Sequence, residues 1–70
     1  MLRTYFKLER DGYYCAVYAP ATNKGATRIY DYIDDLVGTE EAINASSWCE
    51  LAEIGERYEG DGFTITVVEE

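Results

Sequence analysis

The side chains best suited to acid–base or nucleophilic chemistry are fourteen carboxylates, two cysteines and two serines, and the chain has no histidine. Histidine is the commonest general base and a common metal ligand, so most ordinary catalytic mechanisms are removed. Cys15 and Cys49 have no histidine to form a thiolate pair. Ser46 and Ser47 fit the start of a helix better than a nucleophile. The sequence therefore predicts no catalytic residue and no enzyme.

Clustered carboxylates suggest two other kinds of chemistry, namely glycoside hydrolysis and calcium binding. Asp34 with Asp35, or Glu53 with Glu56, could supply the acid and base of glycoside hydrolysis. A chain of 70 residues hardly forms the cleft that this reaction needs. The acidic turn at residues 59–62 lacks the alternating ligands and distant glutamate of an EF-hand loop. Because the glycine spacing of phosphate-binding loops is also missing, we expect no metal site and no cofactor.

Charge is distributed unevenly along the chain. The formal net charge is −8. Up to Arg28 there are five basic and two acidic residues, whereas the remainder has twelve acidic residues against the single Arg57. Such a chain is repelled by nucleic acids and anionic membranes and attracted to basic protein surfaces. We therefore expect a protein partner with a basic surface, no direct contact with nucleic acid and no membrane binding.

The sequence also predicts the cellular compartment and the redox state of the two cysteines. No run approaches the roughly 18 apolar residues of a membrane span, and the first residues lack the apolar core of a secretory signal. We expect a cytoplasmic protein in which Cys15 and Cys49 are reduced thiols. A disulfide that joins the hairpin to a helix is the alternative.

The elements that position these groups begin with a predicted β-hairpin over residues 2–19. Its first strand alternates in polarity, and Asp11-Gly12 is typical of a two-residue type I′ turn. This turn would place Leu8 opposite Cys15 and Tyr5 opposite Tyr18. The core face of the hairpin would then consist of Phe6, Leu8, Cys15 and Val17. Its reverse face would carry Arg3, Tyr5, Lys7, Glu9, Tyr14, Ala16 and Tyr18.

A loop and a helical region over residues 26–55 follow. One helix has an apolar face of Ile29, Ile33, Leu36 and Val37 and ends at Gly38. Beyond Thr39, a second helix spans Glu40 to Ile54, or a short turn precedes a separate helix that begins at Trp48. Both alternatives turn the same side chains inward, namely Trp48, Leu51 and Ala52.

A final strand is predicted over residues 63–68, where Phe63, Ile65 and Val67 alternate with more polar residues. The fold class is therefore α+β, with residues 1–70 as a single domain in the order ββααβ. We expect a three-stranded sheet with both helices packed on one face. The last strand is expected beside the first, with pairing to the second strand left open.

Two surfaces are candidate partner-binding sites. The acidic face comprises Asp31, Asp34, Asp35, Glu40, Glu41, Glu50, Glu53 and Glu56. The aromatic hairpin face comprises Tyr5, Tyr14, Tyr18 and Lys7. In size and acidity the chain resembles the small inhibitors that phages and mobile elements use against host nucleases, such as anti-restriction and anti-CRISPR proteins. That resemblance implies a protein-binding inhibitor that imitates the charge of nucleic acid.

Four alternatives remain open at the level of sequence. The carboxylates can serve solubility alone. The aromatic hairpin face can dock a structural or regulatory subunit onto a larger complex, or can join two copies in a homodimer. Exposed tyrosines can also stack nucleic-acid bases, but the negative net charge disfavours this interaction.

Overall fold

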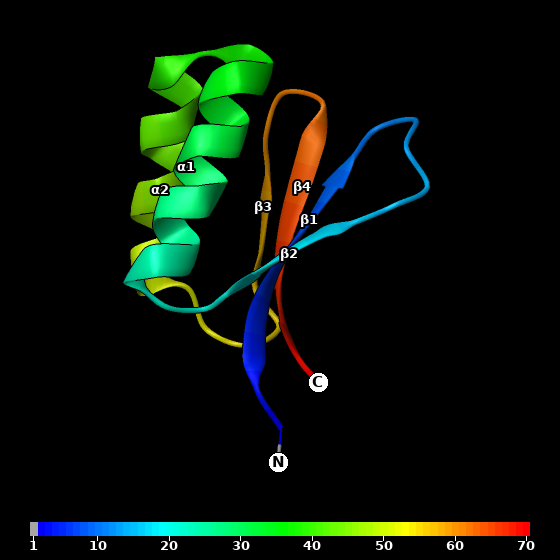
Figure 1. The fold of residues 1–70 in the computed structure, drawn as a ribbon, viewed down its shortest axis with the longest axis vertical. Coiled ribbons are helices and arrows are strands. Elements are labelled where there is room, and N and C mark those ends of the chain that lie inside the picture. Colours follow the sequence, from blue (N-terminus) through cyan, green and yellow to red (C-terminus); the bar gives the residue numbers. More distant parts are fainter. Residues whose placement is uncertain (1) are drawn as a thin grey trace.

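The computed structural model describes residues 2–70 and has two strands, then two helices, then two strands (Figure 1). The elements are β1 (Thr4–Arg10), β2 (Val17–Pro20), α1 (Asn23–Val37), α2 (Thr39–Leu51), β3 (Arg57–Glu59) and β4 (Phe63–Glu69). The strands form one antiparallel sheet in the order β2-β1-β4-β3. Both helices pack on the same face of this sheet. The α+β class is confirmed, but the sheet has four strands where three were predicted.

The register of the first hairpin differs from the prediction by two residues. A type I′ turn needs positive φ at both central residues, but only Gly12 has it (φ 83°). The N–H of Tyr13 still bonds to the carbonyl of Arg10 at 3.1 Å, as in a type II turn. Such a turn splays the strands, so pairing resumes later, with Leu8 opposite Val17. Residues 13–16 therefore form a projecting loop (Figure 1).

This shift moves Cys15 out of the core that the sequence predicted for it. Cys15 lies exposed in the loop, and Val17 is only half-buried. Ala19 takes the buried position opposite Phe6. Strand β2 begins at Val17 and includes Pro20, which an edge strand tolerates because its outer side needs no N–H donor.

The second hairpin contains the strand that the sequence prediction missed. The three residues of β3 pair with β4, Tyr58 lying opposite Ile65. The predicted acidic turn at residues 59–62 is the connection between them, closed by a hydrogen bond from the N–H of Gly60 to the carbonyl of Phe63. β4 also pairs with β1 along its whole length, which confirms the predicted neighbour of the last strand.

The helices begin and end near their sequence signals, with two differences. α1 starts three residues before the predicted Ala26, because the side chain of Thr22 caps it by accepting a hydrogen bond from the N–H of Gly25. It ends at Gly38, as predicted, with φ 109°. α2 is one continuous helix that ends at Leu51, which excludes a separate helix beginning at Trp48.

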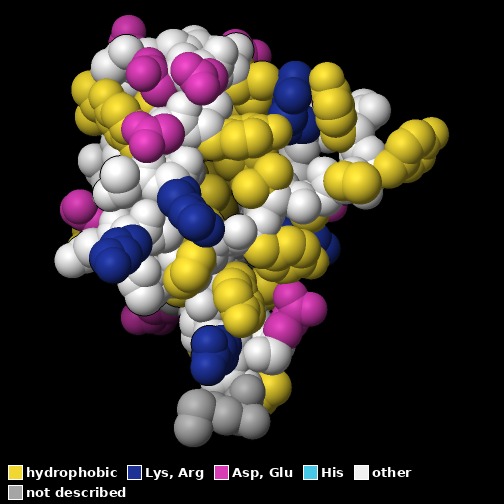
Figure 2. Space-filling model, viewed as in Figure 1, with side chains coloured by type: hydrophobic (Ala, Val, Ile, Leu, Met, Phe, Trp, Pro, Cys, Tyr) yellow, Lys and Arg dark blue, Asp and Glu magenta, His cyan; other side chains and the backbone are white. Residues whose placement is uncertain are grey.

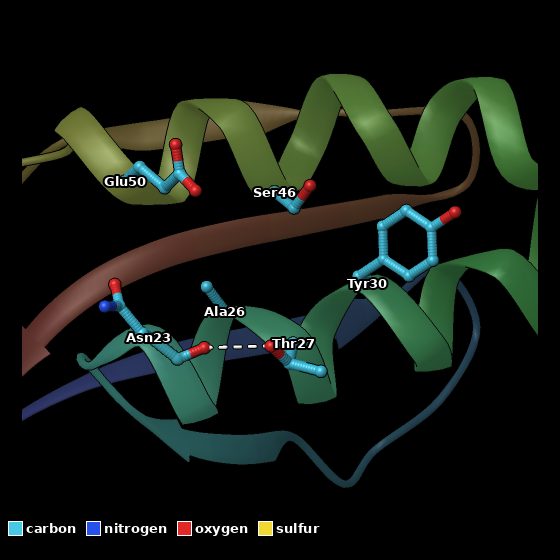
Figure 3. A pocket seen from close by; sticks show the side chains of 6 residues that line it. All are labelled: Asn23, Ala26, Thr27, Tyr30, Ser46 and Glu50. Atoms are coloured by element: carbon cyan, nitrogen blue, oxygen red, sulfur yellow. Dashed lines mark hydrogen bonds between the residues drawn. The ribbon is translucent and has the colours of Figure 1, made fainter.

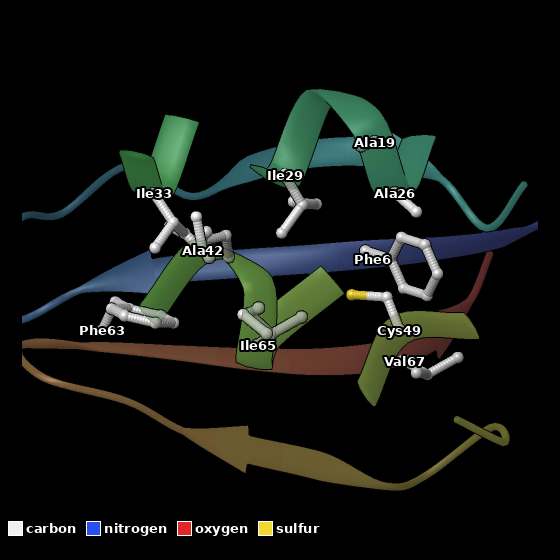
Figure 4. Close-up of a cluster of buried hydrophobic side chains, with 12 residues drawn as sticks. Phe6, Ala19, Ala26, Ile29, Ile33, Ala42, Cys49, Phe63, Ile65 and Val67 are labelled. Carbon is white, nitrogen blue, oxygen red and sulfur yellow. The ribbon is translucent and has the colours of Figure 1, made fainter. Parts of the chain in front are cut away.

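The core lies between the helices and the inner face of the sheet (Figure 4). Its largest fully buried side chains are Phe63, Leu8, Ile29, Ile33 and Ile65. On α2 the inward residues are small, namely Ala42, Ala45 and Cys49. Trp48 and Ala52 are half-buried against the core, but Leu51 is 85 % exposed, so its predicted inward orientation is wrong. Val37, predicted on the inner face of α1, is also exposed.

Both thiols are free, and their surroundings predict different reactivities. Cys15 is exposed, whereas burial of Cys49 raises the pKa of its thiol from 9.0 to about 12. At pH 8 the Cys49 thiol is therefore protonated as well as shielded, and thiolates are the reactive form. We expect Ellman's reagent to modify one thiol per native chain and both in denaturant. Cys15→Ser should abolish the native reaction; rapid modification of Cys49 in that variant would contradict the burial.

Candidate functional site

The acidic face divides into two groups at opposite ends of the helical layer. Asp31, Asp34 and Asp35 occupy the last turns of α1, and Glu40 and Glu41 open α2, so these five meet around the connection between the helices. We call this group the acidic end. Figure 2 shows carboxylate side chains gathered there, with Lys and Arg side chains farther down the helical layer. The remaining three residues, Glu50, Glu53 and Glu56, lie at and beyond the other end of α2.

Three of the eight carboxylates accept hydrogen bonds from other residues of the chain. Asp34 accepts a hydrogen bond from the hydroxyl of Thr39 at 2.6 Å, across the connection between the helices. Glu56 accepts one from the N–H of Glu53 at 2.7 Å. Glu41 accepts one from the hydroxyl of Tyr58 at 2.5 Å. The exposed carboxylates of Asp31, Asp35 and Glu40 in the acidic end form no such bond within residues 2–70, so a partner can reach them.

Tyr58 ties the acidic end to the sheet. Its ring lies 5.6 Å from that of Trp48 and stacks on Phe63 at 6.1 Å between ring centroids. Burial, then the hydrogen bond and charge of Glu41, raise the pKa of Tyr58 from 10.0 to about 12. Glu41 is therefore a structural residue that fixes the start of α2 against β3. The sequence prediction missed this role because β3 itself was missed.

Charges on α1 run against the helix dipole. Lys24 and Arg28 lie in its first half, whereas Asp34 and Asp35 lie in its last turn, where the partial charge of the helix is negative. An unfavourable charge in the first or last turn, as at Lys24, Asp34 and Asp35, costs about 0.3–1 kcal/mol at an exposed site. Solubility would be served equally well by carboxylates at the helix start. Glu40 and Glu41, in contrast, lie in the first turn of α2, where negative charge is favourable.

No basic side chain forms an ion pair with the acidic end within the described part of the chain, although Arg10 lines a pocket together with Asp35. The ion pairs of residues 2–70 are Lys7 with Glu9 at 3.9 Å and Arg57 with Glu59 at 2.7 Å, both on the sheet. The uneven distribution of charge along the sequence thus gives an uneven distribution over the fold, with carboxylates concentrated at the acidic end.

The aromatic hairpin face is only partly assembled. Tyr5 and Tyr18 lie on the sheet face away from the helices and meet edge-to-face at 6.3 Å, although Tyr5 pairs with Pro20 and Lys7 with Tyr18. Diagonal contacts of this kind are within reach of aromatic side chains. Tyr14 is fully exposed in the projecting loop and not in a strand, so its predicted place on this face is wrong. The hypothesis that this face joins two copies stays a prediction.

A groove of about 310 Å³ lies between the two helices (Figure 3). Asn23, Thr27 and Tyr30 line it from α1, and Ser46 and Glu50 line it from α2. The hydroxyl of Ser46 donates to the carbonyl of Ile43 at 3.2 Å, so its proton is already engaged by the backbone. The groove thus presents one carboxylate and neutral polar groups, with no activated nucleophile.

The outer face of α2 was missed by the sequence prediction. Ile43, Ser47 and Leu51 recur every four residues, on the side opposite Ala42, Ala45 and Cys49. Ile43 is 51 % exposed, and Ile54, in the turn after the helix, is 57 % exposed. We call Ile43, Ser47 and Leu51 the outer stripe. Its spacing could have been found in the sequence, but the apolar residues on both sides of α2 hid which side is inward.

Residues 2–70 bring no three metal-ligating side chains close enough to hold an ion. No helix in this range is long and apolar enough to cross a membrane. The fold and surface thus define a small α+β domain with an acidic end and an uncovered helix face. No family model, curated protein or solved structure matches the chain.

Proposed function

We propose that this protein is a non-catalytic binding domain that recognises a basic surface of another protein through the acidic end. The observation that carries the proposal is the set of exposed carboxylates of Asp31, Asp35 and Glu40, which form no ion pair within residues 2–70. Of these, Asp35 lies in the last turn of α1, where negative charge opposes the helix dipole. Carboxylates placed in this way raise the association rate with a basic partner and form charge-assisted hydrogen bonds to Arg and Lys.

The class of partner follows from the same chemistry. Extended basic surfaces are typical of proteins that bind nucleic acids, because those proteins neutralise phosphates with Lys and Arg. A row of protein carboxylates competes for the same side chains. Inhibition of a nucleic-acid-binding protein by charge mimicry is thus the function that we infer for the acidic end.

The proposal is tested by affinity capture from a lysate with two variants of equal charge. Asp31→Asn, Asp35→Asn and Glu40→Gln together remove three charges from the acidic end. Asp11→Asn, Asp61→Asn and Glu69→Gln remove three exposed charges elsewhere. We expect the native protein and the second variant to retain the same basic proteins at about 0.05 M salt and to release them at about 0.5 M.

The first variant is expected to retain little of that set. Equal losses in the two variants would show that net charge alone matters and that the acidic end is no specific site. Retention that is indifferent to salt would contradict an electrostatic interface. Addition of double-stranded DNA should displace the captured proteins if the acidic end occupies a nucleic-acid-binding surface.

A further inference from the structure

Helix α2 has apolar residues on two opposite sides, and their sizes are reversed from those of an ordinary surface helix. The inward residues Ala42, Ala45 and Cys49 are small and buried. The large residues Ile43 and Leu51 point outward, at 51 % and 85 % exposure. An ordinary surface helix turns its large apolar residues toward the core, whereas α2 exposes Ile43 and Leu51 on the side away from it. The outer stripe is therefore a face of α2 that no other element of the fold covers.

Carboxylates accompany the outer stripe along the helix. Glu40 lies one turn before Ile43, and Glu50 lies beside Leu51, both exposed. Glu53 follows the helix at the same end. An occupant of the stripe must therefore offer apolar side chains in its centre and positive charge at its margins.

A second copy of the chain does not meet this requirement, because two outer stripes in contact would bring like-charged margins together. A helix with one apolar face and Lys or Arg beside it meets both conditions, and such helices bind through residues at spacings of three and four. We propose that the outer stripe docks a basic amphipathic helix of a partner protein. This inference rests on the proposed function and adds the apolar contact and the partner's secondary structure.

The test uses two synthetic peptides of about 18 residues, or about five helical turns, made only of leucine and lysine. One has its leucines on a single helical face, and the other has the same composition in scrambled order. We expect calorimetry to show that the amphipathic peptide binds the native protein about tenfold or more tightly than the scrambled peptide.

Variants assign the contact to the outer stripe. Ile43→Ser with Leu51→Ser should weaken binding of the amphipathic peptide about tenfold. Leu2→Ser with Tyr14→Ser removes two exposed apolar side chains elsewhere and should leave binding unchanged. Glu40→Gln with Glu50→Gln should weaken binding and reduce its salt dependence. Circular dichroism verifies that each variant is folded.

Three results would overturn the inference. Equal affinity for the two peptides, or unchanged affinity in the Ile43→Ser, Leu51→Ser variant, would mean that charge alone attracts the peptide. The proposed function would survive either result, because its own test depends on the acidic end and not on the stripe. A dimer in sedimentation that this variant abolishes would identify a second copy as the occupant.

Discussion

Replacement of Phe63 by alanine is expected to leave the protein largely unfolded at room temperature. Phe63 is 1 % exposed, and it is among the largest fully buried side chains (Figure 4). Truncation of a buried phenylalanine costs about 3–5 kcal/mol, through lost burial and the cavity left behind. A single core in a chain of this size rarely supplies more than about 3–5 kcal/mol. The loss is therefore comparable with the whole stability.

Urea titration followed by far-ultraviolet circular dichroism measures this effect. The matched control is Tyr14→Ala, which removes an aromatic ring that is fully exposed in the projecting loop. That change should alter the free energy of unfolding by no more than about 0.5 kcal/mol. A Phe63→Ala variant with the urea midpoint of the native protein would mean that the core is not packed as described.

Gly25→Ala is expected to destabilise the protein although alanine is the better helix former. In an unconstrained helix, this change stabilises by about 0.5–1 kcal/mol. Here a Cβ atom at position 25 would lie 1.5 Å from the carbonyl oxygen of Pro20. That oxygen belongs to the backbone of β2, so α1 must move away from the strand. We expect a loss of about 1–3 kcal/mol or more, the usual range for overpacking.

Thermal unfolding checks the sign of the effect. Each kcal/mol lowers the Tm of a domain of this size by about 4–8 °C. The control is Lys24→Ala, the exposed neighbour in the same helical turn, which removes a cation from the positive end of α1. Its Tm should stay equal or rise. A Tm for Gly25→Ala at or above that of the native protein would contradict the close approach of α1 to β2.

The parts of the fold that were predicted from sequence are those with a local signal. The alternation in β1 and β4 and the spacing of Ile29 and Ile33 identify their buried sides without knowledge of the neighbours. Gly38 marks the end of α1 for a similarly local reason, because few other residues adopt its positive φ.

The parts of the fold that were predicted wrongly depend on contacts between residues far apart in the sequence. The sequence Asp11-Gly12 permits more than one turn type, and the register of β2 is fixed by Ala19 and Val17 against β1 and the core. The three residues of β3 are too few for an alternating pattern, and they form a strand because β4 offers an edge. No local pattern reports such pairing.

The candidate site was predicted as a set of residue types and not as an arrangement, and its binding role stays a prediction. The division of the eight predicted carboxylates between two ends of the helical layer depends on the antiparallel packing of α1 and α2. Asp34 and Glu41 are engaged by Thr39 and Tyr58, which only the folded chain reveals. Leu51 was turned inward in the prediction because helical spacing alone does not show which of two apolar sides the sheet covers.

The two edge strands of the sheet, β2 and β3, affect whether the protein aggregates at high concentration. β2 has four residues and ends in Pro20, and β3 has three residues, two of which are the charged Arg57 and Glu59. Edge strands that are short, charged or contain proline are poor templates for the addition of a further strand. Edge-to-edge growth of the sheet into fibrils is thereby resisted.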